Sequence, residues 1–206
     1  MTDRRTFISA IPAAAAALAA FDVAELRAST MPVDGAPWDL SWVEKISKAK
    51  YPVVWNAFEV NDGTVLELVK FFLDHYHEVY NTSVTDTLPV VVFRKVGTAP
   101  AYTDAMWDKY GIGEVEKVND HNGAPSRSNV FVPAIQALQQ RNTIPLVCNI
   151  ALGFYARKLA AKVGAQPQDV ATELRANLLP GAILVPSGIF ALTRAQHAGA
   201  VYMLGT

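Results

Sequence analysis

The sequence predicts a single α/β domain in which helices cover both faces of a mainly parallel sheet of about five strands. Short apolar runs, such as "LPVVVF" at 88–93 and "IPLVC" at 144–148, alternate along the chain with longer helical patterns. The runs are continuously apolar instead of alternating with polar residues, which is typical of strands buried on both faces of a sheet. The predicted architecture is therefore a three-layer α/β/α domain.

The first 20 residues predict an export signal that is not part of the domain. Residues 4–8 read "RRTFI", the twin-arginine pattern, and an alanine-rich run broken by Pro12 leads to a small-x-small site at 17–19. A membrane helix is the alternative interpretation, but about a dozen apolar residues are fewer than the roughly 20 that span a bilayer. We expect a Tat-type signal peptide over 1–20 and a periplasmic protein.

A linker is expected over 21–37, where Pro32, Gly35 and Pro37 interrupt any periodicity, and the domain is expected over 38–206. A short helix should follow Asp39, a candidate N-cap. "YPVVWNAF" from residue 51 predicts the first strand, "NDG" at 61–63 a turn, and the next residues a helix. "LPVVVFRKV" predicts the second strand.

The 97–130 segment is expected to be an insertion with one short helix around Trp107, followed by a polar loop that acts as a lid or an excursion. Beyond it we expect a helix near 131–142, the strand "IPLVC", and a helix that starts after the cysteine. "QPQDVATELRANLLPG" predicts a further helix, with Pro167 in its first turn. The strand "AILVPSG", a helix over about 189–198 and the strand "AVYML" complete the domain.

Charge and composition exclude several classes of partner. The chain has 18 basic and 19 acidic residues, and no Lys/Arg cluster follows the signal, so nucleic acid is not expected as a partner. No later segment has the 18 continuous apolar residues of a membrane span. The single cysteine cannot form a disulfide within the chain.

Ligands of an open parallel sheet gather beyond the carboxyl ends of its strands, where helix N-termini also point. The residues predicted at those ends form the candidate site, and they are Asn56, Arg94, Cys148, Asn149, Ser187 and Gly188. The turn "FEVNDGT" has neither a hydroxyl-rich phosphate loop nor a glycine-rich nucleotide motif, so no flavin or nucleotide cofactor is expected.

Two other site types are disfavoured by the spacing of their candidate residues. "VPSGI" lacks the glycines that flank a nucleophilic serine at two residues on each side, so Ser187 is interpreted as a helix cap. The histidine pair His75 and His77 would face opposite sides of a helix, while His121 and His197 lie far apart in the sequence. No metal site is therefore expected.

Cys148 leaves two interpretations open. Unpaired cysteine is among the most buried residue types, so it can be a small apolar side chain in the core. Alternatively, the first turn of the following helix points its amides at the sulfur and favours the thiolate, which is a nucleophile.

The segments "LVCNIALGFYARKL" and "LLPGAILVPSGIFALTRAQHAGAVYML" resemble the DsrE/DsrF-like family, which includes the sulfur-relay subunits DsrE and TusD. As in that family, a strand delivers a cysteine to the start of a helix. A "PG" turn, a strand, "VPSG" and a helix ending in "Q-x-x-G" then close the domain. The resemblance covers about the last 65 residues well and 51–96 only as an order of elements. The whole chain is most similar to the Tat-exported subgroup.

The resemblance implies a flavodoxin-like fold, assembly into homo- or hetero-oligomers such as trimers or hexamers, and a persulfide on Cys148. The first hypothesis is a periplasmic sulfur carrier or sulfurtransferase. In it, Asn149 and the helix amides stabilise the thiolate, Arg94 adds positive charge, and a protein or small sulfur compound donates or accepts sulfur. The alternative is a non-catalytic ligand-binding or assembly module with Cys148 packed in the core.

Overall fold

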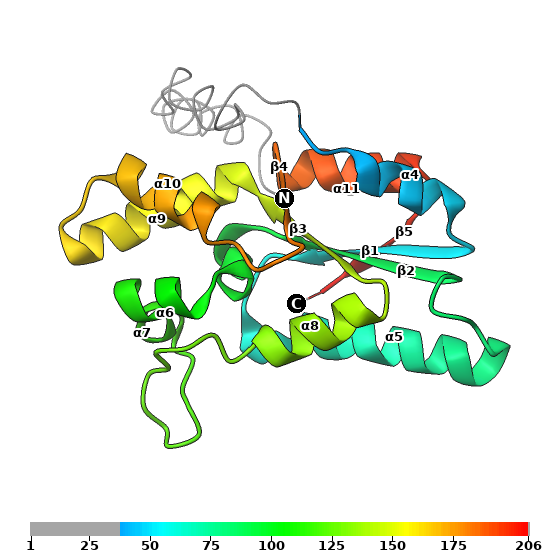
Figure 1. Ribbon diagram of the computed structural model, residues 1–206, viewed down its shortest axis with the longest axis horizontal. Helices are drawn as coiled ribbons and strands as arrows, with labels where there is room; N and C mark the ends of the chain where they lie inside the picture. The colour runs from blue at the N-terminus through cyan, green and yellow to red at the C-terminus, as the bar shows by residue number, and fades with distance from the viewer. Residues whose placement is uncertain (1–37, 206) are drawn as a thin grey trace, which may run out of the picture.

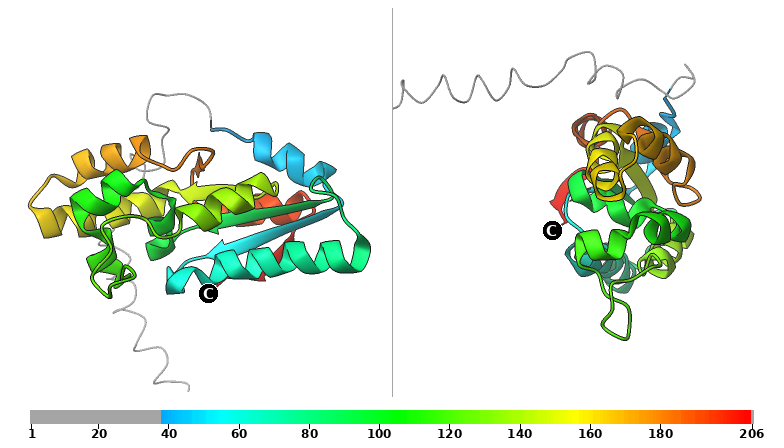
Figure 2. Two further views of the ribbon diagram at one scale, coloured as in Figure 1. Left: turned by 60° about the horizontal axis from the view of Figure 1, so that its bottom comes forward. Right: turned by 90° about the vertical axis from the view of Figure 1, so that its left-hand side faces the viewer.

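The fold of the chain is a five-stranded, all-parallel sheet with helices on both faces, which confirms the predicted three-layer architecture. The computed structural model describes residues 38–205 (Figures 1 and 2). The expected signal peptide over 1–20 and linker over 21–37 lie outside the described residues.

The strand order is β4-β3-β2-β1-β5. Every residue of β2 and β3 is buried, which explains why these two strands are continuously apolar in the sequence. By contrast, all four residues of β5 are exposed at the edge of the sheet. The bounds of the strands are β1 Tyr51–Ala57, β2 Thr87–Phe93, β3 Ile144–Cys148, β4 Ile183–Val185 and β5 Val201–Leu204.

Two hydrophobic cores lie on opposite faces of the sheet. On one face, α4 (Ser41–Lys48) and α11 (Gly188–His197) pack over the sheet and bury Trp42 and Ile46 (Figure 1). On the other face, α5 (Thr64–Tyr80) and α8 (Val132–Gln140) lie side by side over a larger core. The N-cap of α4 is Leu40 and not the predicted Asp39, which lies one residue earlier and accepts a hydrogen bond from the Ser41 amide at 2.9 Å.

Four further helices stand beyond the carboxyl ends of the strands. Helix α9 (Asn149–Val163) follows β3 without a connecting loop, and α10 (Pro167–Ala176) returns along it as its antiparallel neighbour (Figures 1 and 2). Helices α6 (Asp104–Tyr110) and α7 (Ile112–Glu116) pack beside this pair. These four helices extend the domain beyond the carboxyl ends of the strands.

The 97–130 segment contains the predicted short helix around Trp107, which is α6, and a polar loop, but it also contains helical turns that were not predicted. A 3₁₀ helix, η2 (Lys95–Ala101), opens it, and α7 follows α6 directly because Gly111 adopts a left-handed conformation (φ 58°) that ends one helix and begins the next. Gly113 is required where α7 packs against the backbone of Ser126, since a Cβ on Gly113 would lie 2.1 Å from the Ser126 carbonyl oxygen. Helix α7 has only five residues, which is too few to show a helical pattern in the sequence.

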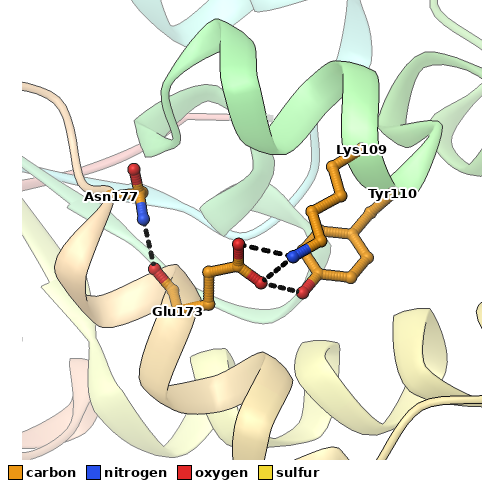
Figure 3. Close-up of polar contacts among 4 residues, drawn as sticks. All are labelled: Lys109, Tyr110, Glu173 and Asn177. Atoms are coloured by element: carbon orange, nitrogen blue, oxygen red, sulfur yellow. Dashed lines mark hydrogen bonds and ion pairs between the residues drawn. The ribbon is translucent and has the colours of Figure 1, made fainter.

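The inserted helices are fastened to α9 and α10 by paired polar groups. Glu173 of α10 accepts hydrogen bonds from Lys109 Nζ at 2.6 and 2.7 Å, and from the Tyr110 hydroxyl (Figure 3). Asn177 Nδ2 in turn donates to the Glu173 carbonyl at 2.9 Å. The 97–130 segment is thus a packed part of the domain.

In the part of the chain that the structure describes, no helix has the length and apolar character needed to cross a membrane.

Candidate functional site

Cys148 is the last residue of β3 and the N-cap of α9. Its backbone is extended (φ −71°, ψ 111°), and its Sγ accepts a hydrogen bond from the Ala151 amide at 3.3 Å. The first turn of a helix has amides without intrahelical partners, so a cap that accepts one of them is favourable, and sulfur replaces the usual oxygen here. The predicted contact between the sulfur and the helix amides is present.

A pocket of about 460 Å³ opens beside Cys148, at the carboxyl edge of the sheet. Three parts of the chain form it: the residues that follow β2, the first turns of α9, and the start of α11. Most of its walls are apolar side chains. The lining residues are Arg94, Lys95, Val96, Cys148, Ile150, Ala151, Phe154, Tyr155, Lys158, Ser187, Gly188 and Ile189.

The charged residues that line the pocket are all cationic. Lys158 pairs with Glu116 of α7 at 2.9 Å, and this carboxylate is only 7% exposed, so the insertion holds Lys158 at the pocket. Lys95 Nζ lies 5.1 Å from the centre of the Phe58 ring. Within residues 38–205, neither Arg94 nor Lys95 has a carboxylate at ion-pair distance. The pocket therefore carries uncompensated positive charge.

Gly188 brings Arg94 and Cys148 to the same point of the pocket. A Cβ on Gly188 would lie 3.1 Å from both Cβ and Cδ of Arg94, and 3.5 Å from Cβ of Cys148. The absence of a side chain thus lets the Arg94 stem pack directly on the start of α11. Ser187 caps α11, as the sequence predicts: its Oγ accepts a hydrogen bond from the Phe190 amide at 3.0 Å.

Two tyrosines lie behind the pocket. The Tyr155 ring is stacked on the Tyr102 ring with centroids 5.9 Å apart, and both side chains are buried. Burial raises the pKa of both hydroxyls well above their usual range, so they remain neutral. Neither hydroxyl has a hydrogen-bond partner among the described residues. The two tyrosines therefore add no charge of their own to the pocket, and the nearby Glu116 carboxylate is paired with Lys158.

Four of the six predicted site residues lie at the pocket: Arg94, Cys148, Ser187 and Gly188. The buried side chain of Asn149 accepts a hydrogen bond from Arg175 Nε at 2.9 Å. Asn56 is not at this pocket. It lies within β1, and its Nδ2 donates to the Tyr202 hydroxyl of β5 at 2.9 Å.

Sequence analysis missed the contribution of α9 to the pocket. Ala151, Tyr155 and Lys158 follow Cys148 by three, seven and ten residues, the spacing of one helical face. Extending the pattern from the cysteine along the helix would have placed Lys158 on the side of the sulfur. Within the described residues, no group of three His, Cys, Asp or Glu side chains is arranged to hold a metal ion.

Comparisons with known proteins identify no family for this chain. No family model matches it, and no curated protein matches it. Among solved structures, the chain is similar to MTH1491 from Methanobacterium thermoautotrophicum, a protein described as of unknown function. The two share 16% sequence identity and a TM-score of 0.44, over 75% of this chain and 98% of the other.

Proposed function

We propose that this protein is a periplasmic, DsrE-like sulfur carrier in which Cys148 accepts sulfane sulfur and holds it as a persulfide. The observation that carries the proposal is the position of Cys148 beside a 460 Å³ pocket with unpaired cations. Cys148 is 5% exposed, but its pocket reaches the surface through the exposed side chains of Phe154 and Ile189. A cysteine that only filled the core would need neither the pocket nor the charge.

The loading step can be written for thiosulfate as a displacement at sulfur. The Cys148 thiolate attacks the sulfane sulfur, a new Sγ–S bond forms, and the S–S bond of thiosulfate breaks. Sulfite leaves with the electron pair of that bond, so Cys148 becomes a persulfide anion and no external oxidant is needed. An acceptor thiolate then takes the outer sulfur by the same displacement, which restores the Cys148 thiolate.

Two features support the stabilisation of negative charge on this sulfur. The Ala151 amide already donates to Sγ at 3.3 Å, and the partial positive charge of a helix N-terminus favours an anion there. The stem of Arg94 packs on Gly188, which also lies against Cys148, so Arg94 and Cys148 line the same end of the pocket. Neither the thiolate nor the anionic donor is opposed by a carboxylate among the lining residues.

Intact-mass spectrometry tests the proposal. The protein is incubated with thiosulfate or polysulfide, and wild type is compared with Cys148→Ser. We expect wild type to gain the mass of one sulfur atom, to lose it on treatment with a thiol reductant, and Cys148→Ser to gain nothing. The proposal fails if neither protein gains sulfur or if both gain it equally.

A second candidate function, assembly of the chain with copies of itself, is favoured by β5. Its side chains Val201, Tyr202, Met203 and Leu204 are all exposed, and no described residue pairs with its outer edge. An apolar, uncharged edge strand is a template for strand pairing. Sedimentation velocity of wild type and Met203→Lys tests this: we expect an oligomer that the lysine dissociates, and a monomeric wild type would exclude it.

A further inference from the structure

The pocket changes in character from its inner end to its mouth. Cys148 and Gly188 are buried, Arg94 is half-buried, and the stem of Arg94 packs on Gly188 at the inner end. At the mouth, the apolar side chains of Phe154 and Ile189 are 43% and 68% exposed, and the exposed side chains of Lys95 and Lys158 lie on the same outer part of the pocket. The residues thus match an elongated ligand that has a negative head at the sulfur and an apolar body toward the surface.

The volume of the pocket also exceeds what an inorganic donor needs. Pockets of about 300–1,000 Å³ generally hold small organic ligands, and 460 Å³ lies within this range. Thiosulfate would use the cations but leave the apolar walls against water. Because covering apolar surface is favourable, a donor with a hydrocarbon body gains binding free energy that thiosulfate cannot.

We propose that the sulfur donor of this site is an organic thiosulfonate, an anion whose terminal sulfur is attached to a sulfonyl group that carries an apolar body. This inference rests on the proposed function of Cys148. The Cys148 thiolate attacks the terminal sulfur, the Sγ–S bond forms, and the bond between that sulfur and the sulfonyl sulfur breaks. An organic sulfinate leaves with the electron pair, and Cys148 becomes the persulfide anion.

The experiment compares benzenethiosulfonate with thiosulfate as donors to the full chain, and follows the gain of one sulfur by intact mass over time. Each rate constant is divided by that of the same donor with 2-mercaptoethanol, which removes the difference in intrinsic reactivity. After this correction we expect the wild type to react about tenfold or more faster with benzenethiosulfonate, the size of a modest apolar selectivity.

Ile189→Asn provides the variant at the mouth of the pocket, and Val79→Asn is its matched control. Both side chains are 68% exposed in the wild type, and Val79 lies on α5, away from the pocket. We expect Ile189→Asn to lose much of the preference for benzenethiosulfonate, measured as the ratio of the two corrected rate constants. Val79→Asn should keep the wild-type preference.

The outcomes separate this inference from the proposed function. Equal corrected rates for the two donors overturn the thiosulfonate inference and leave sulfur carriage in place. A preference that survives Ile189→Asn also overturns it, because the apolar mouth would then not be its cause. Loading of Cys148 by neither donor overturns both the inference and the function.

Discussion

Two clusters of charged side chains flank the α9–α10 helix pair, and they differ in whether their charges are paired. In the first, Lys109, Tyr110 and Glu173 satisfy one another (Figure 3). In the second, Arg94 and Lys95 lie at the pocket of Cys148 without a carboxylate partner within 38–205. A paired cluster ties helices together, whereas an unpaired cluster at a pocket leaves its charge available to a ligand.

Charges that look alike in the sequence therefore have different roles in the two clusters. Removing a charge from the paired cluster should alter stability and leave sulfur chemistry untouched. Removing the charge of Arg94 or Lys95 should slow sulfur loading and leave stability unchanged, because no carboxylate loses a partner. The insertion connects the two regions, since Glu116 of α7 holds Lys158 at the pocket.

The largest effect is expected from Arg94→Gln. This change removes the unpaired charge at the inner end of the pocket and orphans no carboxylate. We expect sulfur loading from thiosulfate to slow about tenfold, which corresponds to about 1.4 kcal/mol in the activation free energy. The midpoint of urea unfolding should not change. Loading at the wild-type rate would show that the pocket cations are not used.

A smaller change in loading is expected from Gly188→Ala. The new Cβ would lie 3.1 Å from Cβ and Cδ of Arg94, so the Arg94 side chain must shift. Misplacing a positioning group should slow loading about threefold. The thermal midpoint should stay close to that of wild type, because the better helix propensity of alanine offsets the tight contact with Arg94. A variant that loads slowly because it is unfolded would instead show a lower midpoint.

The paired cluster is tested by Glu173→Gln. The change removes the ion pair with Lys109 and weakens the acceptor of the Tyr110 hydroxyl. We expect a loss of about 1 kcal/mol in the free energy of unfolding, measured by urea denaturation. The rate of sulfur loading should equal that of wild type, and slower loading would contradict the separation of the two clusters.

The smallest expected effect is the acid dependence of the contribution of Glu173 to the free energy of unfolding. Hydrogen bonds from Lys109 and Tyr110 lower the pKa of Glu173 in the folded state, below the value of about 4.3 that an unpaired glutamate has. Its stabilisation is therefore present above about pH 4.3 and is lost as pH falls through the lower, folded pKa. The difference in unfolding free energy between wild type and Glu173→Gln should be constant near neutral pH and shrink in acid.

Glu44→Gln is the control for the acid experiment. Glu44 pairs with Lys48 at 2.6 Å on the surface of α4, where both side chains are more than two-thirds exposed. Exposed pairs of this kind contribute little to stability. We therefore expect unfolding curves like those of wild type at each pH, and an acid-dependent loss equal to that of Glu173→Gln would show that the Glu173 cluster contributes no more than an exposed pair.

The fold followed from the sequence because its signal is periodic and local. Continuous apolar runs such as β2 and β3 are typical of strands buried on both faces, and Ser187 accepts the hydrogen bond from a helix amide that is expected of an N-cap. The candidate site could be predicted in part from the sequence, since the carboxyl ends of parallel strands lie at one edge of the sheet. What could not be predicted depends on contacts between distant segments, such as the pairing of Lys158 with Glu116.

Asn56 illustrates why a strand end alone does not define a site. It lies in β1, next to the edge strand β5, and hydrogen-bonds to Tyr202 there. Cys148 and Arg94 come from β3 and β2, which are neighbours in the sheet. The order of the strands therefore decides which ends form the pocket, and strand order is a property of the whole chain.

Alkylation of Cys148 by iodoacetate and by iodoacetamide tests the central claim most directly. The two reagents have similar size, but only iodoacetate is an anion. Relative to 2-mercaptoethanol, Cys148 of the folded protein should favour iodoacetate, and Arg94→Gln should reduce this preference. If neither reagent modifies Cys148 until the protein is unfolded, the sulfur is sealed in the core and the account of a sulfur-carrying pocket is wrong.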